Sequence, residues 1–235
     1  MDTVNNQFVK IGKCKISRSI RTRASLKRFL FLLGLLVGSL SSMAQTVIWS
    51  DDFESDKGWT LSGEFERGAP LGNGGVSHGY SDPSTAYQGS NVLGVDLSGL
   101  GTNSGDYEPS LSDREYYAIS PVFDCSGYEN VTLTFQRWLN VERSRYDHAY
   151  IDITTDGGSS WHNVWANDYW STITDDDWSS VSVDLSDYAD NSSSVQIRFA
   201  IGATDGDWQF SGWNIDDLQI LGFTPSAGDY RSRQT

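Results

Sequence analysis

The sequence predicts an all-β protein, an antiparallel β-sandwich or jelly roll of about ten strands, from three observations. Apolar and polar residues alternate in many short segments, which is the pattern of a half-buried strand. No apolar pattern with the helical period extends beyond one or two turns. Stretches rich in glycine, serine and aspartate separate the segments, and these residues favour turns. Together these features favour one sandwich.

The expected strands follow from this alternation. The clearest is residues 131–136, where valine, leucine and phenylalanine alternate with threonine and glutamine. Aromatic and β-branched residues, which favour strands, dominate the others. In chain order, the predicted strands are residues 47–53, 59–67, 91–97, 116–123, 131–136, 149–153, 160–165, 181–185, 195–201 and 213–220. Two long loops are expected at residues 68–90 and 98–113.

The first 44 residues are expected to be a secretory signal with a long basic leader. Residues 1–28 carry eight of the 17 lysines and arginines, and residues 29–40 are apolar. This apolar run is shorter than the ~20 residues that span a bilayer. Ser42 and Ala44 fit a signal-peptidase site, so cleavage is predicted after Ala44. The prediction is a secreted, extracellular or cell-surface protein with one module at 45–222 and a flexible tail at 223–235; a retained membrane anchor is the alternative.

Charge and cysteine content narrow the class of partner. Without residues 1–44, nine basic and 30 acidic residues remain, a net charge of −21. Such a surface repels nucleic acid and anionic lipid, so neither nucleic-acid binding nor membrane insertion is expected. Cys125 is then the single cysteine, so no internal disulfide is possible. It is predicted to be a small buried hydrophobic residue rather than a reactive thiol.

The last predicted strand contains a phase slip. Trp213 and Ile215 are followed by Leu218 and Ile220, so the alternation breaks at the adjacent Asp216 and Asp217. A β-bulge produces such a slip and re-aims side chains. A carboxylate turned inward needs a partner, and calcium is a natural one. A second acidic group, residues 51–54, lies in the first strand, so the two groups are expected to share a metal; ordinary solvated turn carboxylates are the alternative.

Aromatic residues are dense in a polar, aspartate-rich part of the chain. They are Trp165, Tyr169, Trp170, Trp178 and Trp208. Flat aromatic faces beside carboxylates and amides are typical of sugar-binding surfaces. The hypothesis is that these five residues form one ligand face for a glycan or protein; packing in the core or under the loops is the alternative.

Two motifs associated with enzymes are not expected to be catalytic here. Residues 154–161 match the Asp-box pattern, whose predicted role is to shape a β-hairpin. Residues 75–79 match G-x-S-x-G around Ser77, but a nucleophile needs this pattern between a strand and a helix, not in a glycine-rich loop. The three histidines have no zinc-site spacing. Peptidase, esterase and sialidase activities are therefore not expected.

Seven segments together resemble the MAM-like jelly-roll modules of bacterial secreted proteins, over residues 48–221. They are residues 51–54, 65–70, 91–94, 120–128, 137–142, 147–150 and 212–217. Such modules accompany peptidase domains of the immune inhibitor A and subtilisin kinds, and occur in surface proteins. The resemblance implies a non-catalytic sandwich with structural calcium, the metal ligands mapping to Asp52 and Glu54 and to Asp216 or Asp217. Animal MAM domains also carry disulfides, which this chain cannot make.

The sequence therefore predicts a secreted, calcium-stabilised, non-enzymatic module that binds an extracellular glycan or protein and is accessory to a peptidase or surface protein. Two alternatives stay open. One is a jelly-roll glycan-active enzyme, a glycosidase or lyase, which would use two facing carboxylates or a base with a tyrosine acid. The other is a detached peptidase accessory module left by truncation.

Overall fold

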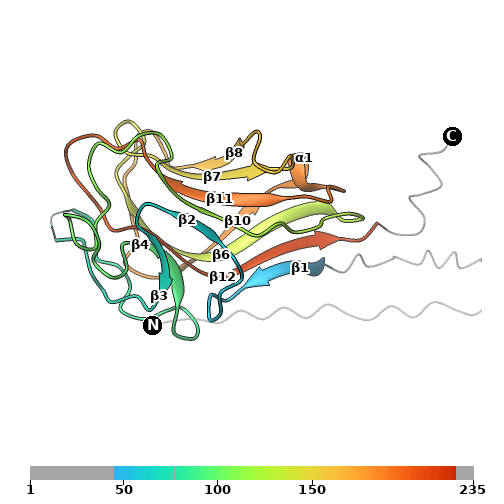
Figure 1. Ribbon diagram of the computed structural model, residues 1–235, viewed down its shortest axis with the longest axis horizontal. Helices are drawn as coiled ribbons and strands as arrows, with labels where there is room; N and C mark the ends of the chain where they lie inside the picture. Colours follow the sequence, from blue (N-terminus) through green and yellow to red (C-terminus); the bar gives the residue numbers. More distant parts are fainter. Residues whose placement is uncertain (1–44, 77, 226–235) are drawn as a thin grey trace, which may run out of the picture. The chain divides into compact units, whose positions relative to one another are not determined.

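The computed structural model describes residues 45–76 and 78–225 of the chain (Figure 1). These residues form 12 strands and one short helix, α1 (Ser186–Ala189). The expected signal segment, Ser77 and residues 226–235 of the expected tail lie outside the described residues. Within the described part, no helix has the length and apolarity needed to cross a membrane.

The strands form two antiparallel sheets, which confirms the predicted fold class. The seven-stranded sheet has the order β10 (Ser179–Asp184), β6 (Glu129–Val141), β12 (Gly212–Phe223), β4 (Val92–Val95), β3 (Phe65–Gly68), with β1 (Gln45–Asp51) paired to β12 and β9 (Ile173–Thr174) paired to β6. The five-stranded sheet has the order β2 (Thr60–Ser62), β5 (Tyr116–Ile119), β11 (Gln196–Ile201), β7 (Ala149–Thr154), β8 (His162–Ala166).

The predicted strand at 59–67 is wrong in one respect, because it is two strands that join different sheets. β2 pairs with β5, whereas β3 pairs with β4. The chain turns at Gly63, which has φ of +62°. A side chain there would also collide with the ring of Tyr116, so glycine is required on both counts. The two-residue β9 and the single turn of α1 were not predicted, because both are too short to show a period.

The core lies between the two sheets and contains aromatic rings from both. The Trp213 ring, on β12, lies 5.4 Å from Phe199 of β11 and 6.3 Å from Phe135 of β6. All three are buried, as are Val131 and Leu133, so the alternation in residues 131–136 places its apolar members inside. Cys125 is also in the core, and burial raises the pKa of its thiol to about 12, which confirms the prediction of an inert buried residue.

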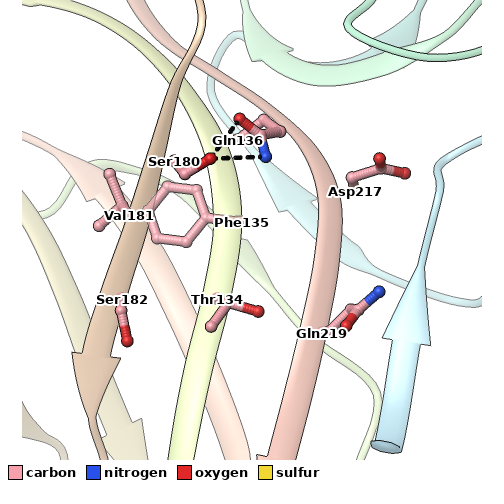
Figure 2. A pocket seen from close by; sticks show the side chains of 8 residues that line it. All are labelled: Thr134, Phe135, Gln136, Ser180, Val181, Ser182, Asp217 and Gln219. Carbon is pink, nitrogen blue, oxygen red and sulfur yellow. Dashed lines mark hydrogen bonds between the residues drawn. The ribbon is translucent and has the colours of Figure 1, made fainter.

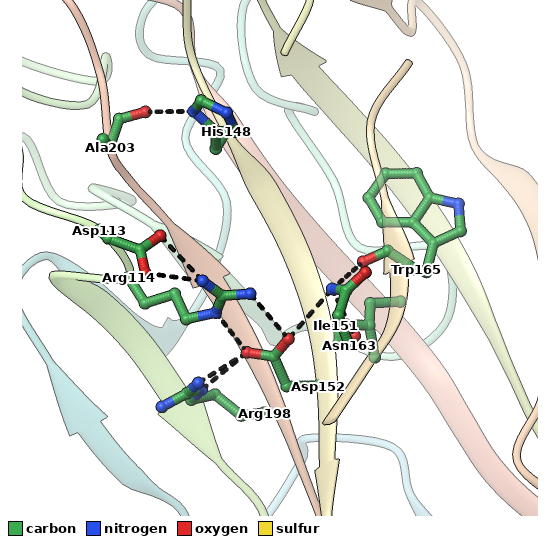
Figure 3. A network of polar contacts seen from close by, with 9 residues as sticks. All are labelled: Asp113, Arg114, His148, Ile151, Asp152, Asn163, Trp165, Arg198 and Ala203. Carbon is green, nitrogen blue, oxygen red and sulfur yellow. Dashed lines mark hydrogen bonds and ion pairs between the residues drawn. The ribbon is translucent and has the colours of Figure 1, made fainter. Parts of the chain in front are cut away.

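A polar network extends across the five-stranded sheet around the buried carboxylate of Asp152 (Figure 3). Arg114 Nε donates to Asp152 Oδ2 at 2.7 Å, and Arg198 Nη2 donates to the same oxygen at 2.6 Å. Asn163 Nδ2 donates to Asp152 Oδ1 at 3.0 Å. Burial alone would raise the pKa of Asp152, but these hydrogen bonds and the arginine charges lower it overall.

The Asp-box segment is a structural hairpin, as predicted. It joins β7 to β8, which pair antiparallel. Asp156 accepts hydrogen bonds from the Ser160 amide at 2.9 Å and the Ser160 hydroxyl at 2.6 Å, and Thr154 Oγ1 donates to it at 2.7 Å. The Ser160 hydroxyl is the main cause that lowers the pKa of Asp156 to about 2. The turn is therefore closed by an ionised carboxylate.

The predicted β-bulge is present in β12. Asp216 is opposite Gln136 of β6, but the next pair along is Gln219 with Thr134, so β12 contains an extra residue. Asp217 has φ of 46°. Before the bulge β12 pairs with β4, and after it β12 pairs with β1. Asp216 lies opposite Gln136 and is buried beside Gln88, whose amide donates to it, whereas Asp217, at the bulge, is half-buried on the outer face of the sheet.

Candidate functional site

The outer face of the seven-stranded sheet carries a cavity of about 290 Å³, here called the sheet-face cavity (Figure 2). Its volume is at the lower end of the ~300–1,000 Å³ of small-ligand sites. Three neighbouring strands, β10, β6 and β12, supply its walls. The lining residues are Thr134, Phe135, Gln136, Ser180, Val181, Ser182, Asp217 and Gln219. Hydroxyl and amide groups predominate, so the cavity offers both donors and acceptors to a neutral polar ligand.

The register of β10 on β6 explains why these polar groups meet. Ser182 is opposite Thr134, and Ser180 is opposite Gln136. Gln136 Nε2 donates to Ser180 Oγ at 3.0 Å, and Ser180 Oγ lies 3.1 Å from Gln136 Oε1. Because side chains two residues apart share a face, these two cross-strand pairs line one row. Strand pairing therefore sets the positions of these polar side chains, and no loop is needed to hold them.

The same row continues into an aromatic cluster. Trp138 is two residues beyond Gln136, and Trp178 is two residues before Ser180, so they form the next pair on this face. Their ring centroids are 5.9 Å apart, and Tyr87 lies 6.3 Å from Trp178. Trp138 is anchored by its Nε1, which donates to the carbonyl of Ser81 at 3.0 Å. Half of the Tyr87 surface is exposed, so the cluster presents an aromatic border to solvent beside the polar row.

A second hollow of about 200 Å³, the strand-edge cavity, shares Asp217 and Gln219 with the first. Its lining residues are Ser50, Asp51, Asp52, Lys57, Gln88, Asp217, Leu218 and Gln219. Two of the predicted metal ligands, Asp52 and Asp217, therefore lie around one hollow. Burial, and then the negative charge of Asp52, raise the pKa of Asp217. Lys57 lies 3.6 Å from Asp51, whereas Asp52 and Asp217 form no ion pair among the residues that the structure describes.

The other two predicted metal ligands are held by the chain itself. Asp216 Oδ2 accepts from the Gln88 amide at 3.0 Å, and burial raises the pKa of Asp216 to about 6. Glu54 Oε1 accepts from the amides of Ser90 and Asn91 at 2.7 and 2.8 Å, which fixes that loop. No three of the four predicted ligands have carboxylate oxygens within 4.8 Å of one another in the described chain. The first and last strands, β1 and β12, do pair next to this hollow, but the Glu54 carboxylate binds the amides of the loop at residues 90 and 91.

The structure places the five predicted ligand-face aromatics in different surroundings. Trp165 packs against the core residue Trp213, with ring centroids 5.3 Å apart. The rings of Tyr169 and Trp170 are in contact, with centroids 4.7 Å apart, and both residues are exposed. Trp178 belongs to the aromatic border of the sheet-face cavity. Trp208 is 52% exposed, and its ring stacks on the His78 ring with centroids 4.6 Å apart. Among these five residues, the ring contacts join only Tyr169 to Trp170.

Gln136, Ser180 and Trp138 were not among the predicted site residues. The alternation of residues 131–136 and 181–185 does indicate which side chains face outward. The register that brings residues 44 positions apart into contact is set by tertiary pairing, which alternation alone does not encode.

No protein-family model matches this chain, and no curated protein matches it. Several solved structures are similar to it. The CBM22-1 xylan-binding domain of Xyn10C from Paenibacillus barcinonensis is 16% identical with a TM-score of 0.46, covering 80% of this chain and 100% of that domain. The K3 cleaved adhesin domain of Lys-gingipain from Porphyromonas gingivalis is 13% identical with a TM-score of 0.42, covering 76% and 99%. The resemblance to MAM-like modules stays a prediction.

Proposed function

We propose that this chain is a non-catalytic module that binds a neutral extracellular glycan on the outer face of its seven-stranded sheet. The observation that carries the proposal is the sheet-face cavity, where a row of hydroxyl and amide side chains ends at the Trp138–Trp178 pair. Sugars present hydroxyl groups and apolar C–H faces on the same ring. Amide and hydroxyl side chains can form hydrogen bonds with the sugar hydroxyl groups, and aromatic rings can pack against the apolar C–H faces.

The charge of the site favours a neutral ligand. Asp217 is the only charged residue among the eight that line the cavity, and the chain from residue 45 carries −21. Anionic polysaccharides and nucleic acids would be repelled. Because Asp217 is the one carboxylate among the eight, the lining does not hold the pair of carboxylates that most glycoside hydrolases use. Binding without turnover is the function that this lining supports; an accessory role beside a peptidase or surface protein remains compatible with it.

Binding should depend on Trp178 and Gln136, and not on Trp170. The assay is isothermal titration calorimetry against neutral oligosaccharides such as xylohexaose and galactotriose, chosen after a glycan array. Truncating a central aromatic residue typically costs 2 kcal/mol or more, so Trp178→Ala should weaken binding at least about tenfold. Gln136→Ala removes only an amide, so it tests the polar row without disturbing the aromatic cluster.

Trp170→Ala is the matched control, because Trp170 is 72% exposed and lies outside the sheet-face cavity. It should bind as the wild type does. Loss of binding in Trp170→Ala with retention in Trp178→Ala would instead place the ligand on the loop surface of Tyr169 and Trp170. The absence of any array signal, or the appearance of cleaved products, would contradict the proposed function.

A calcium ion at the strand-edge cavity is the second part of the proposal. Its support is the pair Asp52 and Asp217, whose like charges share one hollow, with the buried Asp216 next to it. Carboxylate oxygens are the donors that calcium prefers, and Asp216 already accepts hydrogen bonds from the amides of Gln88 and Asp217. The ion would be held chiefly by Asp52 and Asp217, which line the hollow, while Glu54 positions the neighbouring loop.

Removing calcium should therefore lower the melting temperature by several degrees. A ligand at 100 times its dissociation constant adds about 2.7 kcal/mol to the free energy of unfolding. Asp217→Asn should reduce the difference between melts in calcium and in chelator. Glu54→Ala should lower the melting temperature in both, because its hydrogen bonds to the loop amides are lost. Identical melts in calcium and chelator for the wild type would exclude the site.

A further inference from the structure

A different group of carboxylates converges where β6 ends. Glu142 directly follows β6, Asp147 lies in the loop before β7, and Asp205 lies in the loop after β11. One carboxylate oxygen from each lies within 4.8 Å of the others. Calcium binds oxygen at about 2.3–2.6 Å, so ligands on opposite sides of one ion are about 4.6–5.2 Å apart. The three oxygens therefore fit a single coordination sphere.

Glu142 is buried without a partner for its charge. The residue is only 5% exposed, and its carboxylate accepts no hydrogen bond and forms no ion pair in the described part of the chain. Burial, followed by the charges of Asp147 and Asp205, raises the pKa of Glu142. A buried carboxylate normally has a hydrogen-bonding or cationic partner, because its desolvation is costly. Here one oxygen of the carboxylate lies within 4.8 Å of an oxygen of Asp147 and of Asp205, and the nearby Arg143 charge opposes their effect on its pKa.

Asp147 is held in place by its neighbours. The Tyr107 hydroxyl donates to Asp147 Oδ2 at 2.6 Å, and the Asp205 amide donates to Asp147 Oδ1 at 2.9 Å. Each of these oxygens keeps a second lone pair. Because both Tyr107 and Asp147 are fully buried, the carboxylate has little freedom to rotate away. The site is thus organised before any ligand arrives.

The surrounding side chains do not neutralise the group. The charge of Arg143, which borders the same cavity, lowers the pKa of Glu142, but Arg143 makes no ion pair within 4.0 Å among the described residues and lies over the Tyr146 ring at 5.0 Å. The His148 ring is directed by its Nδ1 to the Ala203 carbonyl at 3.0 Å. Asp207 adds a further negative charge nearby. None of the three carboxylates forms an ion pair with a cationic side chain among the described residues.

We propose that Glu142, Asp147 and Asp205 bind one calcium-class cation, at a site separate from the strand-edge cavity. The three ligands come from two loops and a strand end, so the ion would tie the β6–β7 and β11–β12 connections together. Its open side faces a cavity of about 270 Å³ bordered by Tyr146 and Trp208, which leaves room for water or a ligand hydroxyl to complete the coordination.

Terbium luminescence tests this site, because Tb³⁺ replaces calcium and is excited through a nearby indole. Titration of the purified protein with TbCl₃ should give a signal that CaCl₂ displaces. Glu142→Gln keeps the shape of the side chain and should weaken this binding at least tenfold; Asp205→Asn, at a less buried position, should do the same. Trp208→Phe should dim the signal and leave the calcium affinity measured by calorimetry unchanged.

Asp217→Asn is the matched control, since Asp217 lines the strand-edge and sheet-face cavities and lies outside the cavity next to Glu142. It should leave the Trp208-dependent signal intact, and Glu142→Gln should leave glycan binding intact, so this site and the proposed function fail independently. Wild-type terbium and calcium affinities in both Glu142→Gln and Asp205→Asn would overturn the proposal. So would a signal that depends on Asp217 and not on Trp208.

Discussion

Replacing Asp152 with alanine should destabilise the protein by about 3 kcal/mol, measured by urea denaturation at pH 7. The substitution removes a buried carboxylate that two arginines share (Figure 3). The side chains of Arg114 and Arg198 are only 24% and 14% exposed; Arg198 would lose its carboxylate partner, and Arg114 would keep only the exposed Asp113. Breaking a buried pair from one side costs more than the pair itself contributes.

Asp113→Ala is the control for this prediction. Asp113 also pairs with Arg114, at 2.7 Å, but its side chain is 62% exposed, so its loss should cost no more than about 1 kcal/mol. The folded-state pKa of Asp152 is lowered, so its contribution is present above the unfolded pKa and is lost as the pH falls through the folded pKa. The free energies of unfolding of Asp152→Ala and Asp113→Ala should therefore become similar in strong acid. Equal effects at pH 7 would contradict the assigned role of Asp152.

Glu64→Gln should stabilise the protein at pH 8 by about 3 kcal/mol and change little at pH 5. Glu64 is 7% exposed, and its Oε2 is buried without a hydrogen-bond partner. Burial, and then the charges of Asp96 and Glu108, raise the pKa of Glu64 from 4.5 to about 7. A shift of one pKa unit corresponds to about 1.4 kcal/mol. At pH 8 the wild-type Glu64 is ionised, so replacing it with the neutral glutamine removes the free-energy cost of the buried charge.

The direction of the pH dependence follows from the raised pKa. The wild-type contribution of Glu64 is fully present below its unfolded pKa and is lost as the pH rises through about 7. Melts at pH 5 and pH 8, both in chelator, give the comparison. Glu66→Gln is the control: Glu66 accepts hydrogen bonds from the Ser98 amide and hydroxyl, each at 2.8 Å, so its loss should be similar at both pH values. A Glu64→Gln variant no more stable than the wild type at pH 8 would exclude a buried charge.

The fold was predictable because alternation is a local property. The β-bulge at Asp216 and Asp217 could be placed to the residue, since a slip in phase has few other causes. The split of residues 59–67 was missed because one glycine carries the turn between two strands that each look extended. Sequence could not show that these strands join opposite sheets, because that depends on partners more than 20 residues away.

The candidate site was less predictable. Density of aromatic residues along the chain suggested one face, but alternation within β8 points Trp165 inward, onto Trp213. Trp178 does lie at a surface, through contact with Trp138 forty positions earlier. The acidic residues show the same limit. Asp52 and Asp217 meet, whereas the convergence of Glu142 with Asp205 comes from two loops whose relation only the folded chain defines.

The position of β12 has a consequence for biosynthesis. Without it, the seven-stranded sheet separates into β10–β6–β9, β4–β3 and an unpaired β1, because β12 supplies every pairing between these parts. β12 is also the last described strand to be translated. The nascent chain therefore exposes incomplete sheet edges until residue 223 has been made, and such edges invite aggregation.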